Sequence, residues 1–501
     1  MLAWTIYISF LGALALLLLP KSNAMAARVL ALLTALAGFA IASTAFFQNR
    51  TGELVTVTRH AWIPALGIEY HLAADGISLS LVLLTGIVAV TGILFSWNIE
   101  RRTKEFFAFY LLLIGAVYGV FLSYDLFLLF VFYEIVIIPK YFLIATWGST
   151  RKEYGAMKLA IYSFVGSAMV LVGLIAAYVV AGGKTMSLDG LAGFTFPVHF
   201  QMWAFPLVFV GFAILAGLWP FHTWAPTGHV AAPTAASMLL AGVVMKLGAY
   251  GCLRVAMTLF PLGLGPWGFH VLGLGSWRDV FAVLAVIGIV YGALVALVQK
   301  DFKFVIGYSS VSHMGFILLG LMTLNQLGLS GAVVQMFSHG ILAGLLFATV
   351  GRMVYDRTHT REFASLGPMN LNKAIPFAAV TFVVAGMASM GLPGFSGFIA
   401  ELMIVTGAWH AFPALALCVG AGILLGVIYV WRAMQKAFFS DGEAAPPHDP
   451  LPTITLPEKL AAIILIATSV TIGLYPQVLL KVITPALNSP LFHGLQNGGW
   501  R

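Results

Sequence analysis

Long apolar stretches separated by short polar ones run along the whole chain. A helix needs about 20 predominantly apolar residues to cross the hydrocarbon of a bilayer. About fourteen such stretches can be counted, at residues 3–20, 27–47, 76–98, 106–123, 126–147, 157–181, 203–220, 234–260, 280–298, 304–323, 329–350, 374–410, 412–434 and 459–478. The pattern predicts an all-α polytopic membrane protein, built as a single membrane domain over residues 1–501. The first stretch lacks the small-residue cleavage site of a signal peptide, so we expect it to be retained as a helix.

Polar stretches are few, and none is long enough to predict a soluble domain. The longest are residues 48–75, which we expect to form an outer loop, and residues 440–458, "SDGEAAPPHDPLPTITLPE". The second is rich in proline and predicts an irregular cytoplasmic loop before the last helix. Composition agrees with a membrane protein, because only 9% of the residues are charged against about 25% in soluble domains.

The formal net charge of +8 suggests a nucleic-acid partner until its distribution is considered. If the N-terminus faces outward, the segments "ERRTK", "TRKEYGAMK", "QKDFK" and "RMVYDRTHTRE" all fall on the cytoplasmic side, with most of the 26 Lys and Arg residues. Such an excess of Lys and Arg in cytoplasmic loops marks membrane topology. We therefore expect both termini on the periplasmic side and no nucleic-acid partner.

The cysteines and the glycine-rich stretches give no support for a bound cofactor. Cys252 and Cys418 are isolated and far apart, so they do not form the thiolate sets that hold zinc or iron–sulfur clusters. Neither a GxxxxGK[ST] motif nor a strand-borne GxGxxG motif occurs. We expect no cofactor and no metal in this chain.

Two apolar stretches are interrupted by proline and glycine. Residues 217–228 read "GLWPFHTWAPTG" and residues 391–397 read "GLPGFSG". Proline breaks a helix, and a break at membrane depth is tolerated where it is buried in protein or lines a watery cavity. If residues 106–260 (helices 4–8) and 279–434 (helices 9–13) form two five-helix sets, each break falls in the fourth helix of its set.

A set with an odd number of spans is inverted relative to the preceding set. Interrupted helices at matching places in inverted repeats indicate an ion site. The breaks in helices 7 and 12 therefore predict such a site. The alternative is that proline and glycine, which are common in membrane helices, coincide here by chance.

Charged side chains in the membrane are costly and therefore candidates for function. Those well within the apolar stretches are Glu134, Lys140, Lys246 and Glu401. Lys246 is flanked by small residues and suits a group that takes up and releases a proton, although a salt bridge between helices is the alternative. Glu401 follows the second break by one to two turns, where it could exchange protons with water. The aspartates at the edges of spans are expected to reach water, namely Asp75, Asp125 and Asp279.

Glu134 and Lys140 are harder to explain as a pair. Six residues of helix rise about 9 Å and turn the side chain by about 120°, so the two do not share a face. Pro139 can bend the helix between them. The alternative for Lys140 is that its ammonium group extends along the helix to the cytoplasmic interface.

Histidines also occur at intramembrane or broken-helix positions, namely His222, His229, His313, His339 and His410. His339 lies in mid-span, and because histidine as a residue type titrates near neutral pH, a role in proton transfer is favoured. His313, in "SSVSHMGF", is the second candidate because the neighbouring serines could hold a water. No spacing indicates a pair that would ligate haem, and a hydrogen-bonded structural role stays open for each.

Several long motifs resemble one known family. "PFHTWAPTGHVAAPTAASMLLAGVVMKLGAYG", "KDFKFVIGYSSVSHMGF", "GAVVQMFSHGI", "VYDRTHTRE" and "GLPGFSGFIAELMI" are similar to the antiporter-like M subunits of bacterial NADH:quinone oxidoreductase (complex I). More distantly, the chain resembles subunits of cation/proton antiporters and membrane-bound hydrogenases. The likeness covers nearly the whole chain.

The resemblance implies fourteen helices, two inverted five-helix repeats and broken helices 7 and 12. It also implies a multi-pass protein of the bacterial inner membrane that translocates H+ while neighbouring subunits reduce quinone. The chain would have no redox centre of its own. Its partners would be the lipid bilayer and other membrane subunits of the complex, including antiporter-like paralogues.

The family has a charged axis formed by a glutamate on helix 5, lysines on helices 7 and 8 and a glutamate on helix 12. By motif, Glu134, Lys246 and Glu401 match the first, third and fourth of these, and His339 matches a helix-11 histidine. Leu215 stands in place of the helix-7 lysine. Acidic residues that usually follow are replaced by Thr227 and Ala232.

Lys140 stands where the family has an apolar residue. We therefore hypothesise that Lys140 replaces the absent helix-7 lysine as the partner of Glu134. The alternative is that the first half of the axis is altered or inactive and Lys140 only reaches the interface.

Other functions remain open from the sequence. One is a cation (Na+)/proton antiporter subunit, and another is a membrane subunit of a hydrogenase or a carbon dioxide-converting assembly. Partner subunits decide among them, since they define the electron donor and the quinone. The residues of the motif "PTAASMLLAGVVMKLGAYG" favour complex I.

Overall fold

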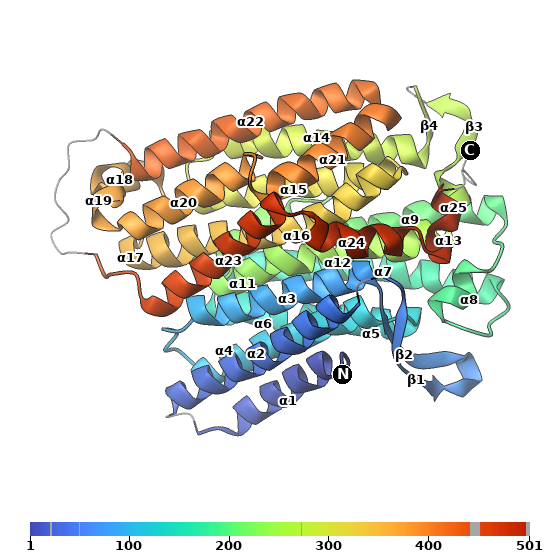
Figure 1. Ribbon diagram of the computed structural model, residues 1–501, viewed down its shortest axis with the longest axis horizontal. Coiled ribbons are helices and arrows are strands. Elements are labelled where there is room, and N and C mark those ends of the chain that lie inside the picture. The colour runs from blue at the N-terminus through green and yellow to red at the C-terminus, as the bar shows by residue number, and fades with distance from the viewer. Residues whose placement is uncertain (21–22, 50, 272, 441–450, 497–501) are drawn as a thin grey trace.

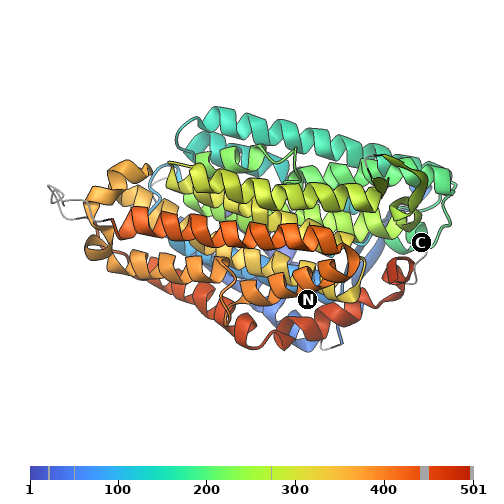
Figure 2. The same cartoon turned by 90° about the horizontal axis from the view of Figure 1, so that it is seen from above.

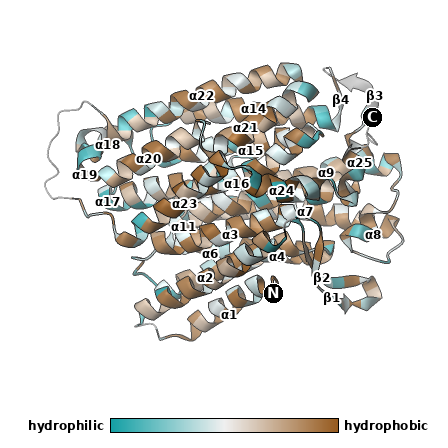
Figure 3. Cartoon of the chain, viewed as in Figure 1, coloured by the Kyte–Doolittle hydropathy of each residue, from teal (hydrophilic) through white to brown (hydrophobic). Residues whose placement is uncertain are grey.

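The computed structural model describes residues 1–20, 23–49, 51–271, 273–440 and 451–496. The long helices run side by side along one common direction (Figure 1), and the view from above shows the same alignment (Figure 2). Apolar residues dominate the helices, and hydrophilic ones gather toward the two ends of the bundle (Figure 3). The described part of the chain contains twelve helices long and apolar enough to cross a membrane. The predicted all-α polytopic membrane fold is thereby confirmed.

The first part of the chain forms α1 to α13. Its elements are α1 (Trp4–Leu18), α2 (Ala24–Gln48), α3 (Gly76–Phe95), α4 (Thr103–Leu122), α5 (Leu126–Ile135), α6 (Ile137–Trp147), α7 (Lys152–Val180), α8 (Leu188–Ala192), α9 (Val198–Ala216) and α10 (Trp224–Ala231). The next span, Thr234–Leu259, alternates between α-helix and π-helix. It consists of α11 (Thr234–Leu239), a π-helical segment (Leu240–Val244), α12 (Met245–Gly251), a second π-helical segment (Cys252–Ala256) and α13 (Met257–Leu259).

The second part continues with long helices and ends with shorter ones. Its elements are α14 (Trp277–Val298), α15 (Phe302–Met322), α16 (Gln326–Ala348), a π-helical segment (Thr349–Tyr355), α17 (Asp356–Thr358), α18 (Phe363–Leu366), α19 (Leu371–Ala374), α20 (Pro376–Ser389), α21 (Ser396–Ala411), α22 (Pro413–Phe438), α23 (Leu456–Leu474), α24 (Gln477–Leu487) and α25 (His493–Gln496). Three apolar helices are shorter than the twelve candidate spans, namely α1, α20 and α24. The predicted arrangement as two inverted five-helix repeats stays a prediction.

The connections between the helices include two small antiparallel hairpins. The expected outer loop at residues 48–75 contains an antiparallel hairpin of β1 (Val55–Ile63) and β2 (Ile68–Ala74). A second small hairpin is formed by β3 (Pro266–Val271) and β4 (Leu274–Ser276). Of the predicted cytoplasmic loop at residues 440–458, positions 441–450 lie outside the described residues, and α23 begins at Leu456.

Aspartates fix the starts of three interior helices. Asp75, Asp125 and Asp301 each accept hydrogen bonds at one carboxylate oxygen from two backbone N–H groups in the first turn of α3, α5 and α15, respectively. A helix leaves its first N–H groups without partners, and an N-cap side chain satisfies them. The expectation that Asp75 and Asp125 reach water is wrong, because both are fully buried. Capping lets these carboxylates be buried at the ends of the bundle.

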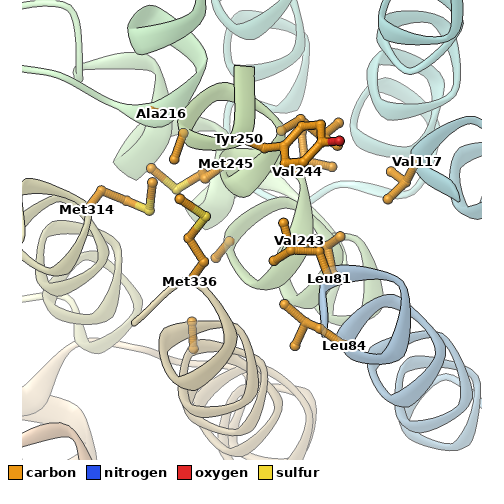
Figure 4. Packing of buried hydrophobic residues seen from close by; sticks show 14 of the residues in the cluster. Leu81, Leu84, Val117, Ala216, Val243, Val244, Met245, Tyr250, Met314 and Met336 are labelled. Carbon is orange, nitrogen blue, oxygen red and sulfur yellow. The ribbon is translucent and has the colours of Figure 1, made fainter. Parts of the chain in front are cut away.

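The centre of the bundle consists of α3, the span Thr234–Leu259, α15 and α16, which are almost entirely covered by other helices. Figure 4 shows Leu81 and Leu84 of α3, Met245 of α12, Met314 of α15 and Met336 of α16 pointing into this core. In contrast, α2 and α22 expose long apolar faces. The candidate residues on α12, α15 and α16 therefore lie away from the apolar surface of the bundle.

The two ends of the bundle carry different elements. The N-terminal residues, the β1–β2 hairpin and α25 lie at one end, and α17, α18 and α19 lie at the other (Figure 1). The basic segment at residues 352–361 belongs to the second end. The first and last described segments of the chain thus lie at the same end of the bundle.

Candidate functional site

Both predicted helix breaks are present. α9 ends at Ala216, where Gly217 follows in the left-handed region with φ 84°, and helix resumes at Trp224. The backbone oxygen of Ile214 accepts from the N–H of Gly217 at 3.1 Å and from the indole Nε1 of Trp224 at 2.8 Å, so residues on both sides of the break bind this carbonyl. α20 ends at Ser389 and α21 begins at Ser396, with Gly391 between them at φ 75°.

Lys246 lies on α12 between the two π-helical segments and is fully buried. Its Nζ donates to the backbone oxygen of Ala241 at 2.5 Å, within the first π-helical segment. The same Nζ lies 2.9 Å from Nδ1 of His339 on α16. π-Helical turns are rare within α-helices, and those that occur are often found at functional sites. Among the described residues no carboxylate lies within 4.0 Å of Lys246, so the salt bridge considered from the sequence is not formed.

His339 and His313 continue from Lys246 toward the second break. Their rings stack with centroids 5.4 Å apart and an interplanar angle of 27°. His313, on α15, places Nε2 3.1 Å from Oγ of Ser389, the last residue of α20. Its Nδ1 lies 3.3 Å from Oε1 of Glu401 on α21. Residues from α12, α15, α16, α20 and α21 thus meet in one buried polar row.

Glu401 contacts the second break directly. A Cβ atom added at Gly391 would lie 2.7 Å from Oε2 of Glu401, and the positive φ of Gly391 is itself unfavourable for other residues. The break therefore leaves the space that this carboxyl group occupies. Only 7% of the Glu401 surface is exposed.

A small cavity lies along this part of the row. Its volume is ≈ 10 Å³, about the room that one water molecule needs. Its polar lining comprises Ser309, Ser310, His313, Gln335, His339, Ser389 and Glu401. The cavity therefore joins both histidines to Glu401.

Lys140 lies at the other end of the candidate set and does not reach toward the interface. It is 1% exposed, and its Nζ donates to Oγ of Ser163 on α7 at 2.9 Å. The neighbours Ile138 and Phe142 on the same helix face outward. The ammonium group of Lys140 therefore does not extend to the cytoplasmic interface, which was the alternative considered from the sequence.

The surroundings of Ser163 place Lys140 near the first break. Gly166, one turn along α7, packs against α9, where a Cβ added at Gly166 would lie 3.5 Å from Cβ of Ile214. Leu215, the next residue, is buried. The ammonium group of Lys140 thus lies on the face of α7 that adjoins the end of α9.

Glu134 is half-buried on α5, and its Oε1 has no hydrogen-bond partner among the described residues. α5 and α6 meet at Val136, whose backbone is itself helical (φ −59°, ψ −29°), and together form one span, Leu126–Trp147. No ion pair within 4.0 Å joins Glu134 to Lys140 in the described part of the chain. This agrees with the expectation that the two side chains do not share a helix face.

The remaining histidines lie outside this row. His229 is buried with Nε2 3.4 Å from Sδ of Met245, His222 is buried in the first break, and His410 is exposed near the end of α21.

Sequence reasoning missed three parts of the site. Gln335, on α16, lies 3.3 Å through Nε2 from Nδ1 of His313. Its position four residues before His339 puts both on one helix face, so this spacing was a usable signal. Ser163 and Ser389 had no such signal, because their partners lie on other helices.

Arg254 also corrects an expectation. It lies within the span Thr234–Leu259, although only Lys140 and Lys246 were expected among basic residues in the membrane. Arg254 is fully buried, and its Nη2 forms an ion pair with Asp75 at 2.6 Å. The pair satisfies both charges and joins this span to the start of α3.

Comparison with known proteins identifies relatives of the chain. The sequence model of the family described as NADH:quinone oxidoreductase/Mrp antiporter, TM, matches residues 123–427. The NADH-quinone oxidoreductase subunit M of Rhodobacter capsulatus is 37% identical over 447 residues, which cover 86% of this chain and 83% of that protein.

Solved structures show the same fold. A chain of respiratory complex I from Thermus thermophilus superimposes with a TM-score of 0.87 at 25% identity, covering 99% of both chains. A chain of the Mrp complex from Dietzia sp. DQ12-45-1b superimposes with a TM-score of 0.84 at 21% identity, covering 100% of this chain and 98% of that one. The fold is thus shared by both kinds of complex.

Proposed function

This multi-pass chain belongs to the NADH:quinone oxidoreductase/Mrp antiporter family of membrane subunits, and from that premise we propose that it translocates protons within a respiratory NADH:quinone oxidoreductase. The proton moves along the buried row from Lys246 to Glu401. The electron transfer that drives this movement takes place in other subunits. The 37% identity to a subunit M of such an enzyme supports the assignment.

The observation that carries the proposal is the 2.9 Å contact between Nζ of Lys246 and Nδ1 of His339. Both groups bind and release protons, and neither has a carboxylate as counterion at this contact. A lysine in the membrane without a counterion is costly and is retained for function. A packing role would be filled at lower cost by an apolar side chain.

The transfer requires only proton movements. An N–H bond of the Lys246 ammonium breaks while an N–H bond forms at Nδ1 of His339. An N–H bond at His339 then breaks, and the proton reaches His313 through the small cavity that both histidines line, because the stacked ring faces themselves carry no proton. Glu401 then holds the proton beside the break at Gly391, where freed backbone groups favour water.

Lys140 acts on this row by charge. We assign to it the role of the absent helix-7 lysine, namely the cation that interacts electrostatically with Glu134. Its burial and its hydrogen bond to Ser163 support this role, because the ammonium is held inside the bundle near the end of α9. Changing the separation between Glu134 and Lys140 changes the electrostatic potential at Lys246, which favours or opposes its protonation.

The same assignment gives the membrane, the neighbouring subunits and the transported ion. We place the chain in the bacterial inner membrane with both termini on the periplasmic side, as the distribution of Lys and Arg favours. Its neighbours are other membrane subunits, including antiporter-like paralogues. It holds no redox group of its own, and H+ rather than Na+ is its substrate, because the row contains one carboxylate instead of a cage of oxygen ligands.

The test is a Lys246→Met variant in the complete complex. NADH-driven proton uptake is measured in inside-out membrane vesicles with a pH-sensitive dye. We expect uptake to fall at least about a hundredfold, as loss of a group that transfers protons does. Lys184→Met, a lysine in the connection after α7, is the control and should pump normally. Unchanged pumping by Lys246→Met, or sodium uptake in place of proton uptake, would overturn the proposal.

A further inference from the structure

Gln335 is a polar neighbour of His313 that cannot itself exchange protons. It lies on α16 and is 1% exposed. Its Nε2 lies 3.3 Å from Nδ1 of His313, and its Oε1 has no hydrogen-bond partner among the described residues. Both His313 and Gln335 line the same small cavity.

Two groups compete for Nδ1 of His313. Oε1 of Glu401 and Nε2 of Gln335 both lie 3.3 Å from it. An amide NH2 group only donates hydrogen bonds. When Gln335 donates to Nδ1, this nitrogen must carry a lone pair, and the ring proton is on Nε2, which then donates to Ser389.

This tautomer constrains Glu401. An ionised carboxylate 3.3 Å from the lone pair of Nδ1 would be repelled, whereas an uncharged carboxylic acid at the same distance would not. The arrangement with Gln335 donating therefore corresponds to a protonated Glu401 and a neutral His313.

The opposite proton state requires the opposite amide orientation. Before the proton passes from His313 to Glu401, it is held by an N–H bond at Nδ1 and Glu401 is a carboxylate; on transfer this N–H bond breaks and an O–H bond forms at Oε1. The N–H faces the carboxylate, but it would also face the NH2 group of Gln335, which is a contact between two donors. Half a turn of the amide replaces NH2 by Oε1, which then accepts from Nδ1. Among the described residues Oε1 has no hydrogen-bond partner, so turning the amide breaks no hydrogen bond at this oxygen.

We propose that Gln335 is a positioning residue whose amide orientation selects where the proton between Glu401 and His313 resides. With NH2 toward the ring the proton stays on Glu401, and with the oxygen toward the ring it stays on His313. The inference rests on the proposed function of the row. It deepens that function by naming the group that delays the proton until the amide turns.

The charges around His313 are those that its packed neighbours supply. Glu401 faces it from α21, and His339 faces it from α16 with Lys246 of α12 behind. From α22, the hydroxyl of Tyr429 binds Ser309, one turn before His313. α20 contributes the uncharged Ser389. A Gln335→Met substitution changes none of these titratable groups, so a change in pH dependence would arise from the loss of the amide.

The experiment compares Gln335→Met with the wild type in membrane vesicles. Met has a similar length and offers no N–H donor. Both orientations of the amide stabilise a His313–Glu401 pair that holds one proton, so without the amide the pair releases this proton at lower pH. We expect NADH-driven proton uptake at neutral pH to fall about three- to tenfold, as loss of one buried hydrogen bond allows. We expect the acid limb of the pH profile to move about one pH unit toward acid pH.

A matched control is Gln201→Met. Gln201 is also buried, and its amide donates to Phe196 and accepts from Leu262, far from the row. We expect this variant to keep the wild-type pH profile. If Gln335→Met does not assemble, Gln335→Asn keeps an amide that is one methylene too short, and we expect the same shift toward acid pH.

An unchanged profile in the Gln335 variants would overturn the inference, and so would a lower rate with the profile unmoved. Pumping by Lys246→Met would instead overturn the proposed function. The two failures are therefore distinguishable.

Discussion

The two halves of the polar row differ in how their charged groups meet. In the second half, Lys246, His339, His313 and Glu401 follow one another in direct or ring-stacked contact. In the first half, Lys140 binds a serine, and one oxygen of Glu134 has no hydrogen-bond partner in the part of the chain that the structure describes. The second half can hand a proton from group to group, whereas the first half can act only through the electric field of its charges.

Leu215 is the residue at which the two halves part. It is buried on α9, which packs against both α7 and α12. A Cβ added at Gly248 of α12 would lie 3.0 Å from the carbonyl carbon of Leu215. Leu215 therefore lies, buried, on the helix that packs against both α7, where Lys140 binds Ser163, and α12, which carries Lys246. Apolar surroundings of this kind screen charges weakly, so the electrostatic potential of Lys140 acts on Lys246 with little loss.

The comparison predicts the largest effect for Glu401. A Glu401→Gln substitution keeps the shape but removes the acid, so we expect proton uptake in vesicles to fall at least about a hundredfold. Glu69→Gln, on the β2 strand in an exposed pair with Arg59, is the control. Pumping near the wild-type rate would show that the second half does not carry the proton.

A smaller effect is expected at Lys140. Lys140→Leu removes a charge that acts at a distance, and we expect uptake to fall about fivefold, which is typical of a coupling between sites. The sharper test is the double variant Lys140→Leu with Leu215→Lys, which moves the cation to α9 and should restore most of the rate. If Lys140→Leu pumps normally, Lys140 is not the partner of Glu134.

The smallest effect is expected at Ser163, which only orients Lys140. Ser163→Ala leaves the ammonium with no hydroxyl partner, and we expect about a twofold lower rate of proton uptake. Ser167→Ala, one turn further along α7, is the matched control because Ser167 binds the backbone of Phe164. A loss as large as that of Lys140→Leu would mean that Ser163 takes part in the transfer itself.

Much of the fold and the identity of the charged candidates could be predicted from the sequence. The helix breaks at residues 217–228 and 391–397 are local, since proline and glycine act on their own backbone. Glu134, Lys140, Lys246 and Glu401 stand out because a charge in an apolar stretch is costly wherever its helix packs.

The pairing of these residues was not predictable in the same way. The contact of Lys246 with His339 and that of Lys140 with Ser163 each join two helices. They depend on how each helix is rotated about its axis, which the packing of apolar side chains decides. Arg254 shows the same limit, because its partner Asp75 lies 179 positions away.

The sequence by itself determined that this chain crosses a membrane many times, where its helices break and which side chains bear a buried charge. These properties follow from the free energy of placing each residue in hydrocarbon, which depends on the residue and its near neighbours. Only the tertiary structure decided that Lys246 meets a histidine, that Lys140 points inward and that Gln335 competes with Glu401 for His313. Those outcomes depend on distances of about 3 Å between side chains of different helices, and packing of the whole bundle sets them.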